Sequence, residues 1–121
     1  MDTLFSHVSV LTMDERMSVW LDAFVGVTDG KIAYLGKKAP EEQPEHIVDA
    51  SGMVLMPGLI NCHTHLPLSL LRGYGDELAQ DEWLRRSVFP RQARMDARSV
   101  KAAALLGIAQ CLRFGVTSVS E

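Results

Sequence analysis

The sequence predicts an α/β chain in which a unit of short strands is followed by a strand–helix–strand unit. Residues 5–11 carry apolar side chains at alternate positions, which is the period of a half-buried strand. Residues 97–114 form the clearest helical pattern, with apolar side chains on one face. Strand-like segments at 59–62 and 116–120 flank the helical stretches, and a strand–helix–strand order implies that the two strands are parallel.

The first unit, residues 1–56, is expected to consist of strands separated by turns. Residues 23–27 are rich in β-branched and aromatic side chains and predict a second strand. Asp29 and Gly30 follow shortly after it and form a strong hairpin signal, because glycine tolerates a positive φ. Further short strands, separated by a polar loop and a turn, are predicted over residues 32–36, 47–50 and 53–56.

The second unit, residues 57–121, contains two short predicted helices before the long one. The first spans residues 67–72, with a proline in its first turn, where the missing N–H does no harm. The second spans residues 82–88. It is expected to stop before Pro90, because the residue that precedes a proline disfavours the α conformation.

The long helix has recognisable ends and one apolar face. Asp96 is a suitable N-cap, since its carboxylate can accept a backbone N–H of the first turn. Gly115 is a typical C-terminal stop. The residues that share the apolar face are Val100, Ala104, Gly107, Ile108 and Cys111.

Composition and charge are those of an ordinary soluble globular protein. The chain is 47% hydrophobic and 22% charged, with a net charge of −3. This mild acidity argues against a nucleic-acid partner, because phosphate binding requires clustered Lys and Arg. Glu82 and Asp96 lie among a group of arginines, so solvated helix faces are favoured over a binding patch there. The group comprises Arg85, Arg86, Arg91, Arg94 and Arg98.

No membrane segment or export signal is predicted, and a cytoplasmic location is expected. The longest apolar run, residues 53–60, is interrupted by a Pro-Gly pair and is too short to span a bilayer. Residues 1–12 lack the apolar core of a signal peptide. Cys62 and Cys111 lie far apart and match no metal-binding spacing, so ordinary buried thiols are expected.

The sharpest motif is Asn-Cys-His-Thr-His at residues 61–65, at the end of a predicted strand. Side chains alternate on an extended backbone, so His63 and His65 point the same way and Thr64 points away. Two neutral imidazoles side by side are suited to bind Zn²⁺ or Fe²⁺. Structural or solvated roles are expected for the two remaining histidines, His7 and His46.

The residues around this motif resemble the amidohydrolase superfamily. Residues 56–65, Met-Pro-Gly-Leu-Ile-Asn-Cys-His-Thr-His, are similar to that family's proline-glycine entry into its first barrel strand, which ends in His-x-His. Other segments are similar to the methylthioadenosine and S-adenosylhomocysteine deaminases, whose pattern triazine chlorohydrolases and guanine deaminases share. These segments are residues 70–73, 82–84, 89–90 and 115–118.

The resemblance implies the N-terminal part of a metal-dependent hydrolase TIM barrel, preceded by part of a small β-sandwich. Residues 1–56 would be the N-terminal strands of the sandwich, and residues 57–121 the first βα units of the (β/α)8 barrel. Such a barrel needs about 250 residues, so we expect the remainder of the enzyme to be required to complete it. The chain alone is expected to be inactive and poorly folded, with the catalytic acid–base residues beyond Glu121.

The resemblance also implies a reaction on a small-molecule substrate. One divalent metal is expected, zinc in the first place with iron as the alternative, and His63 and His65 are the ligands this chain would supply. Water activated by the metal would attack an amino-bearing ring carbon of an adenosine derivative such as S-adenosylhomocysteine or methylthioadenosine, and ammonia would leave. Homo-oligomers are common in the family, and the sequence leaves the oligomeric state open.

Gln92 departs from the family pattern. Adenosine-type deaminases have a glutamate two residues after the proline that matches Pro90, and it accepts hydrogen bonds from the ribose hydroxyls. An amide makes weaker bonds to a diol than a carboxylate does, so Gln92 favours a nucleobase, pterin or triazine substrate. Trp83 and Phe89 are candidates to line a substrate pocket, with core packing as the commoner role. For Arg72, a structural ion pair is favoured over a contact with substrate.

Three functions therefore stay open. The first is a hydrolytic deaminase of adenosine derivatives. The second is a guanine- or pterin-type deaminase or a triazine chlorohydrolase, for which Gln92 is less of a difficulty. The third is a non-catalytic amidohydrolase-like scaffold, against which the paired imidazoles of His63 and His65 argue, because a scaffold does not need them in a barrel mouth.

Overall fold

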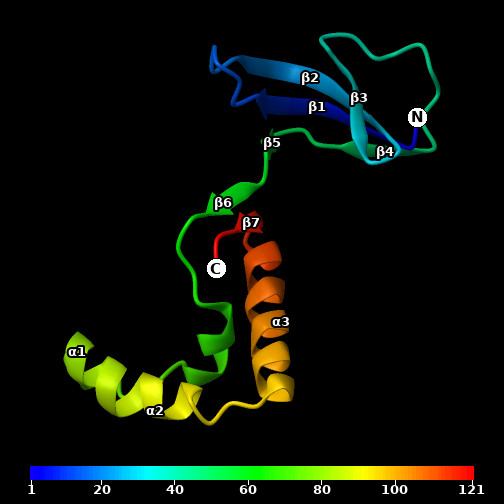
Figure 1. Ribbon diagram of the computed structural model, residues 1–121. Helices are drawn as coiled ribbons and strands as arrows, with labels where there is room; N and C mark the ends of the chain where they lie inside the picture. Colours follow the sequence, from blue (N-terminus) through cyan, green and yellow to red (C-terminus); the bar gives the residue numbers. More distant parts are fainter. The chain divides into compact units, whose positions relative to one another are not determined.

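The computed structural model describes residues 1–121 and contains two compact units, Met1–Pro57 and Gly58–Glu121 (Figure 1). The first unit consists of strands, while the second combines helices with one pair of strands. The chain is therefore α/β, as predicted. The assignment of residues 1–56 to a β-sandwich and of residues 57–121 to a barrel stays a prediction.

One five-stranded sheet forms the first unit. Its strands are β1 (Thr3–Leu11), β2 (Val19–Thr28), β3 (Lys31–Gly36), β4 (His46–Asp49) and β5 (Val54–Leu55). Their order is β3-β2-β1-β4, and β5 also pairs with β1. β2 is antiparallel to β1 and β3, whereas β4 and β5 are parallel to β1. The strands predicted in this part of the sequence are confirmed.

The turn between β2 and β3 has the backbone that the sequence predicts. Asp29 and Gly30 have φ values of 50° and 69°, in the left-handed region that two-residue hairpins of type I′ require at both central positions. The hairpin places Thr28 opposite Lys31. The Asp-Gly signal is therefore confirmed.

The core of the first unit joins residues from β1, β2 and the segment after β4. Along β1 buried residues alternate with more exposed ones, as expected for a half-buried strand. Four partly buried side chains, Phe5, Trp20, Leu35 and Leu55, pack against the buried cluster. The cluster itself comprises Val8, Val10, Ala23, Val25 and Ala50.

The second unit is a strand–helix–strand arrangement. β6 (Leu59–Asn61) and β7 (Val116–Val119) are parallel, with Leu59 opposite Val116 and Asn61 opposite Val119. The parallel pairing is therefore confirmed. The elements between the two strands are the 3-10 helix η1 (Leu66–Leu71), α1 (Gln80–Trp83), the π-helical segment η2 (Leu84–Val88), α2 (Phe89–Gln92) and α3 (Ala97–Arg113).

The prediction that a helix stops before Pro90 is wrong. α1, η2 and α2 follow one another without a break, so the helical backbone continues through the proline to Gln92. The N–H of Phe89 bonds to the carbonyl of Leu84, five residues back. In a regular α-helix the ring of Pro90 would collide with the carbonyl of Arg86, four residues back. The widened π-helical turn accommodates the ring.

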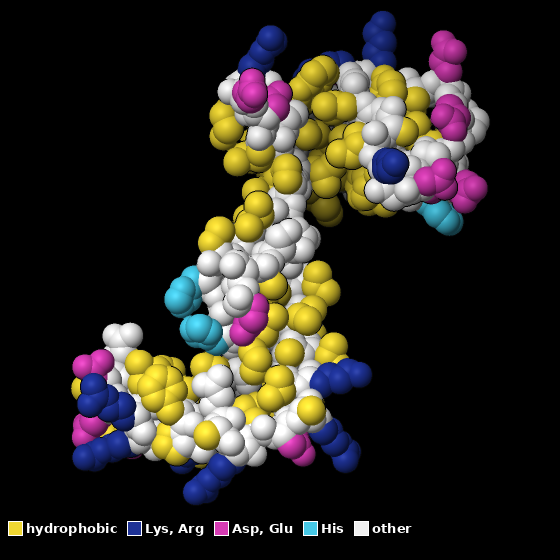
Figure 2. All heavy atoms as spheres, viewed as in Figure 1, with side chains coloured by type: hydrophobic (Ala, Val, Ile, Leu, Met, Phe, Trp, Pro, Cys, Tyr) yellow, Lys and Arg dark blue, Asp and Glu magenta, His cyan; other side chains and the backbone are white.

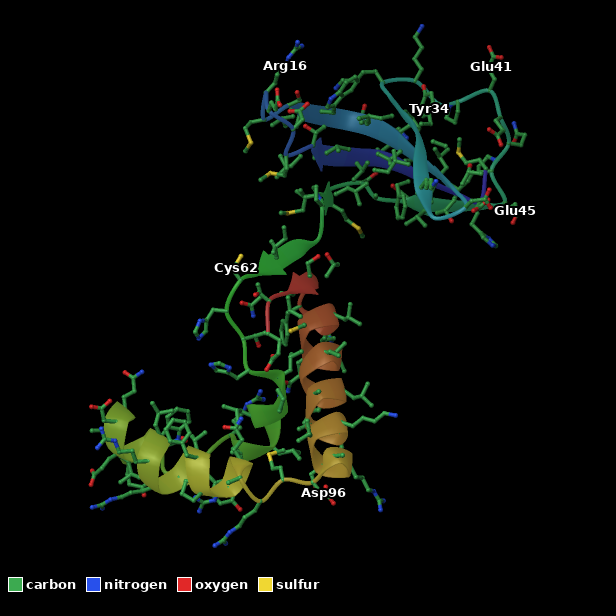
Figure 3. All side chains as sticks on the ribbon, in the orientation of Figure 1. Arg16, Tyr34, Glu41, Glu45, Cys62 and Asp96 are labelled. Carbon is green, nitrogen blue, oxygen red and sulfur yellow. The ribbon has the colours of Figure 1, made fainter.

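Both predicted ends of α3 are confirmed. Asp96, which lies at the start of the helix (Figure 3), is extended and accepts the Ser99 N–H at 2.7 Å. Hydrogen bonds from the side chain and backbone of Ser99 lower the pKa of Asp96, because they stabilise the carboxylate. At the other end Gly115 has a φ of 79°. None of the helices, α3 included, is long and apolar enough to cross a membrane.

The buried face of α3 differs from the predicted one. Ala103 and Gly107 are buried, whereas Val100 and Ile108 are exposed, so the predicted face is wrong at these two positions. α3 packs against η1, and small residues allow the close approach. A Cβ atom added to Gly107 would lie 3.0 Å from Cδ2 of Leu66, tighter than ordinary van der Waals contact.

Cys62 and Cys111 are both free cysteines. Cys111 is half-buried in α3, but Cys62 is exposed in the loop after β6 (Figure 3). The expectation of buried thiols is therefore wrong for Cys62, because β6 ends one residue earlier and the chain leaves the sheet there.

Candidate metal centre

His63 and His65 lie in the loop between β6 and η1, directly after the first strand of the parallel pair. Their ring centroids are 5.2 Å apart, and the ring planes make an angle of 75°. Both residues are exposed. Figure 2 shows the histidine side chains of the second unit (cyan) next to each other on the surface. The two imidazoles are therefore close enough to face a single ion.

The spacing of the rings fits a tetrahedral metal. A Zn–N bond of about 2.0–2.1 Å places the centroid of an imidazole about 3.2 Å from the ion, so two ligating rings at a tetrahedral angle lie about 5.2 Å apart. The centroids of His63 and His65 have this separation. No group of three or more His, Cys, Asp or Glu side chains in residues 1–121 could hold a metal. The candidate centre within these residues therefore consists of the His63–His65 pair.

Gly58, which precedes β6, has a steric reason. A Cβ atom at Gly58 would collide with the side chain of Thr117 on the neighbouring segment. Only glycine lets the start of β6 come this close to β7. The pairing continues through a hydrogen bond from the Leu59 N–H to the Gly115 carbonyl at 2.8 Å. The motif thus fixes the strand that leads into the histidine loop.

Polar groups from both strands hold the histidine loop. Oδ1 of Asn61 accepts the His63 N–H at 3.1 Å, which forms a local turn directly after β6. Oε2 of Glu121 accepts the Leu66 N–H at 2.8 Å, across 55 residues of sequence. The His65 carbonyl accepts the Leu68 N–H at 2.9 Å in the first turn of η1. The loop is therefore anchored at both ends.

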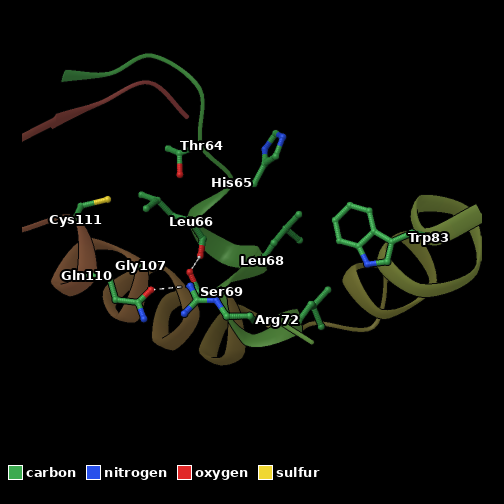
Figure 4. Close-up of a pocket in the computed structure, with 11 residues that line it drawn as sticks. Thr64, His65, Leu66, Leu68, Ser69, Arg72, Trp83, Gly107, Gln110 and Cys111 are labelled. Atoms are coloured by element: carbon green, nitrogen blue, oxygen red, sulfur yellow. Dashed lines mark hydrogen bonds between the residues drawn. The ribbon is translucent and has the colours of Figure 1, made fainter. Parts of the chain in front are cut away.

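A cavity of about 350 Å³ lies beside His65, between η1, α1 and α3. Figure 4 shows Trp83 on its α1 side and the Arg72–Gln110 pair on its α3 side. Its wall mixes apolar and polar groups, as small-molecule sites commonly do. The full lining is Thr64, His65, Leu66, Leu68, Ser69, Leu71, Arg72, Trp83, Gly107, Gln110 and Cys111.

Several contacts hold the indole of Trp83 in place. Its Nε1 donates to the Tyr74 carbonyl at 2.8 Å, and the Ser87 hydroxyl donates to the same oxygen at 3.1 Å. The guanidinium of Arg91 lies 4.4 Å from the centre of the Tyr74 ring, a cation–π contact. The indole is therefore held by its edge while part of it lines the cavity, an arrangement available to a substrate-stacking residue.

Arg72 does not form the ion pair that the sequence favours. Its Nη2 donates to Oε1 of Gln110 at 2.8 Å, and no carboxylate lies within salt-bridge distance (Figure 4). Gln110 lies on the half-buried part of α3 that faces the cavity. The partner is therefore a neutral amide, and the charge of Arg72 stays available at the cavity wall.

Gln92 and Phe89 lie away from this cavity. Both are on α2, both are exposed, and neither lines the cavity beside His65. The structure therefore brings Trp83 together with His65 but does not bring Gln92 to them. The substrate-binding role expected for Gln92 stays a prediction.

The histidines of the first unit are separate from the candidate centre. Nδ1 of His7 lies 2.7 Å from Oδ1 of Asp22, an exposed pair between β1 and β2. His46 is exposed at the start of β4. Neither belongs to a group that could hold a metal.

Asn61 and Glu121 are residues of the site that sequence reasoning missed. A signal for both was present, because Asn61 lies near the end of the predicted strand 59–62 and Glu121 directly follows the predicted strand 116–120. The carboxyl ends of parallel strands meet at one edge of a sheet. The contact between Glu121 and Leu66 depends on the register of β7 against β6, which the sequence alone does not specify.

Comparison with known proteins identifies a family for a range that includes the whole second unit. Residues 54–121 match the profile described as "Amidohydrolase family". This range covers more than half of the chain and includes β6, the histidine loop, the helices and β7. It therefore contains every residue of the candidate metal centre.

Named relatives are similar over nearly the whole chain. A 5'-deoxyadenosine deaminase from Methanosarcina mazei is 38% identical over 120 residues, which is 99% of this chain and 28% of the relative. A 5-methylthioadenosine/S-adenosylhomocysteine deaminase from Nitratidesulfovibrio vulgaris is 33% identical over 123 residues, again 99% of this chain and 28% of the relative. The chain thus spans little more than a quarter of the length of these relatives.

Solved structures are also similar to the chain over nearly its whole length. An adenosine deaminase from Xanthomonas campestris with bound zinc matches with a TM-score of 0.86 and 33% identity, over 99% of this chain and 28% of that one. The atrazine chlorohydrolase TrzN from Arthrobacter aurescens, complexed with zinc, matches with a TM-score of 0.82 and 24% identity, over 97% of this chain and 28% of that one. At this identity the second likeness concerns the fold alone.

Proposed function

Because the chain belongs to the amidohydrolase family, we propose that it supplies the His-x-His part of the active site of a metal-dependent hydrolytic deaminase. The observation that carries this proposal is the placement of the two imidazoles, 5.2 Å apart, directly after β6. Catalytic groups of (β/α)8 enzymes lie at this end of the strands. The remaining ligands and the acid–base residues would come from other parts of the enzyme.

The fold that accompanies this function is a metal-dependent hydrolase barrel. β6, α3 and β7 would form its first βα units, and the sheet of the first unit would be part of a small β-sandwich. The parallel pairing of β6 with β7 supports the first assignment. The likeness to the zinc-bound adenosine deaminase over nearly the whole chain supports both.

His63 and His65 would hold one divalent metal, with zinc as the first candidate and iron as the alternative. Two imidazoles are typical ligands of catalytic zinc, and the similar adenosine deaminase structure is described with bound zinc. A divalent metal in such a site lowers the pKa of water so that hydroxide is available near neutral pH. The chain itself contributes the orientation of the two rings, through the anchored loop.

The proposed substrate is an amino-substituted purine, in the first place an adenosine derivative such as S-adenosylhomocysteine or methylthioadenosine. The named relatives are deaminases of 5'-deoxyadenosine and of these two compounds. Trp83 would stack on the ring system, because its indole lines the cavity beside His65 and is held in place at its nitrogen.

Gln92 supports a second candidate, a guanine- or pterin-type deaminase or a triazine chlorohydrolase. A neutral amide at this position would bind a ribose diol less strongly than a carboxylate would. The two candidates therefore differ in whether the ribose contributes to binding. If the protein deaminates adenosine derivatives, removal of the ribose from the substrate raises KM or lowers kcat. If it belongs to the second candidate group, removal of the ribose has no such effect.

The proposal is tested by turnover of a substrate panel with the complete zinc-loaded protein. The panel contains S-adenosylhomocysteine, methylthioadenosine, 5'-deoxyadenosine, adenine, guanine, a pterin and a chlorotriazine, with ammonia or chloride release as the readout. We expect deamination of the adenosine derivatives, and a loss of about 10³-fold or more in kcat/KM for His63→Ala and His65→Ala, because a ligand of the metal is removed. His46→Ala, an exposed histidine of β4, is the matched control and should keep full activity.

Two results would contradict parts of this proposal. Turnover of guanine, the pterin or the triazine without turnover of any nucleoside would replace the first candidate by the second. Absence of bound metal together with absence of turnover on the whole panel would favour the non-catalytic scaffold.

A further inference from the structure

The histidine loop is held at its two ends by side chains from two neighbouring strands. Asn61, the last residue of β6, accepts the His63 N–H, and Glu121, two residues after β7, accepts the Leu66 N–H. Between these two bonds, residues 62–65 belong to no helix or strand. The backbone that carries both imidazoles therefore depends on these anchors for its conformation.

Glu121 satisfies a donor that would otherwise be left without a partner. Leu66 begins η1, and its N-cap residue, His65, provides no capping bond from its side chain. The first N–H groups of a helix have no partner inside the helix. Leu66 is also buried, at 8% exposure, so an unpaired N–H there would be costly. The Glu121 carboxylate supplies this N–H with a charge-assisted bond.

The parallel register explains how a residue so distant in sequence reaches Leu66. Asn61 pairs with Val119, and the Ser120 N–H donates to the Asn61 carbonyl at 2.9 Å. This last bond extends the hydrogen-bonded pairing of the two strands one residue past the end of β7. Glu121 therefore comes out at the same edge of the sheet as the histidine loop.

The rest of Leu66 is held independently of Glu121. Its carbonyl accepts the Ser69 hydroxyl at 2.8 Å, and its side chain packs against α3 at Gly107. The packing at Gly107 holds η1 on α3, whereas the bond from the Ser69 hydroxyl lies within η1. Loss of the Glu121 contact would leave the bond from the Leu68 N–H to the His65 carbonyl and would loosen the backbone between His65 and Leu66.

We propose that Glu121 is a positioning residue, whose bond to the Leu66 N–H fixes the backbone of His65 and so sets the orientation of the imidazole pair for a divalent metal. This inference rests on the proposed function, since it assigns the loop the task of presenting two metal ligands. Asn61 performs the matching task on the His63 side. Groups that orient metal ligands without touching the metal commonly change metal affinity by about 10–100-fold when removed.

The test uses Co²⁺ as a spectroscopic probe in the complete protein, with four variants. Glu121→Ala removes the acceptor, Glu121→Gln keeps an acceptor oxygen without the charge, and His65→Ala removes a proposed ligand. Glu77→Ala is the matched control, because Glu77 is an exposed carboxylate of the same unit with no hydrogen bond or ion pair. The readouts are Co²⁺ affinity from its visible absorption and, without metal, hydrogen exchange of the segment 62–68.

We expect Glu121→Ala to weaken Co²⁺ binding about 10–100-fold and to accelerate exchange at the Leu66 amide, while exchange in α3 matches that of Glu77→Ala. Glu121→Gln should recover most of the affinity. The inference is overturned if Glu121→Ala equals Glu77→Ala in both readouts, or if Glu121→Gln loses as much affinity as Glu121→Ala. Full Co²⁺ affinity in His65→Ala would instead overturn the proposed function, whatever the exchange of the Leu66 amide shows.

Discussion

The two units of the chain bury their apolar residues to different degrees. In the first unit β1 and β2, with Ala50, build a connected cluster that includes Val8 and Val25. In the second unit Ala103 and Val88 are buried, but large apolar side chains remain at the surface, among them Ile60 at 72% and Phe114 at 75% exposure. The first unit also leaves apolar side chains at the surface, such as Ile32 at 73% and Ile47 at 67% exposure. The difference is that β1 and β2 share a connected buried cluster.

This difference shows how the candidate metal centre is held. The hydrophobic effect fixes β1 and β2 through area that they bury in each other. The histidine loop has no such support, since His63 and His65 are exposed. Its conformation depends instead on a few hydrogen bonds, in which Asn61 and Glu121 accept the His63 and Leu66 N–H groups and the His65 carbonyl accepts the Leu68 N–H. The first unit should therefore be sensitive to changes of volume and polarity, and the loop to changes of individual acceptors.

The largest effect is expected from a charge in the core of the first unit. Val8 is buried at 1% exposure, and Val8→Asp would place a carboxylate there without a partner. We expect the free energy of unfolding to fall by about 4 kcal/mol or more. Denaturant unfolding of the complete protein, followed by hydrogen exchange of β1 and β2, measures the loss.

Ile32→Asp is the control for this substitution. Ile32 lies in β3 of the same sheet but is exposed at 73%, so its replacement should change stability by no more than about 0.5 kcal/mol. Equal losses from Val8→Asp and Ile32→Asp would contradict the assignment of Val8 to a buried core and of Ile32 to the exposed surface of the same sheet.

A smaller effect is expected where α3 meets η1. An added Cβ at Gly107 would lie 2.8 Å from the Ser69 hydroxyl oxygen and 3.2 Å from the Leu66 carbonyl oxygen. We expect Gly107→Ala to cost about 1–3 kcal/mol through this crowding, partly offset by about 1 kcal/mol from the better helix propensity of alanine. Thermal unfolding measures the net change. A rise in Tm would mean that η1 does not pack closely on α3.

The smallest effect concerns the N-cap of α3. The pKa of Asp96 is lowered by its bonds from Ser99, so the capping contribution is present above the ordinary pKa of 3.8 and is lost as the pH falls through the lower folded value. Asp96→Ala should therefore lower Tm by a small amount at pH 7 and by less below the folded pKa. Asp96→Asn keeps an acceptor and should show little pH dependence from this site. Equal losses from Asp96→Ala at both pH values would contradict the assignment.

Most elements could be predicted from the sequence, because their signals are local. The alternation of β1, the Asp-Gly turn, Asp96 and Gly115 each act within a few residues. Three features could not be predicted, because they depend on contacts between residues distant in sequence. The buried face of α3 is set by its approach to η1, and the partner of Arg72 lies 38 residues away.

The third feature is the anchoring of the histidine loop. His63 and His65 stand out in the sequence as a motif, but the contact between Leu66 and Glu121 spans 55 residues and needs the register of two parallel strands. At Pro90, in contrast, a local signal is present but is overridden by the neighbouring backbone. This signal predicts a helix end, but the π-helical turn of η2 before the proline lets the helix continue.

The most direct test of the central claim is anomalous diffraction at the zinc edge from crystals of the complete protein grown with zinc. We expect one anomalous peak about 2.0–2.1 Å from a ring nitrogen of His63 and from a ring nitrogen of His65. A well-occupied zinc that contacts neither imidazole, or only one of them, would contradict it.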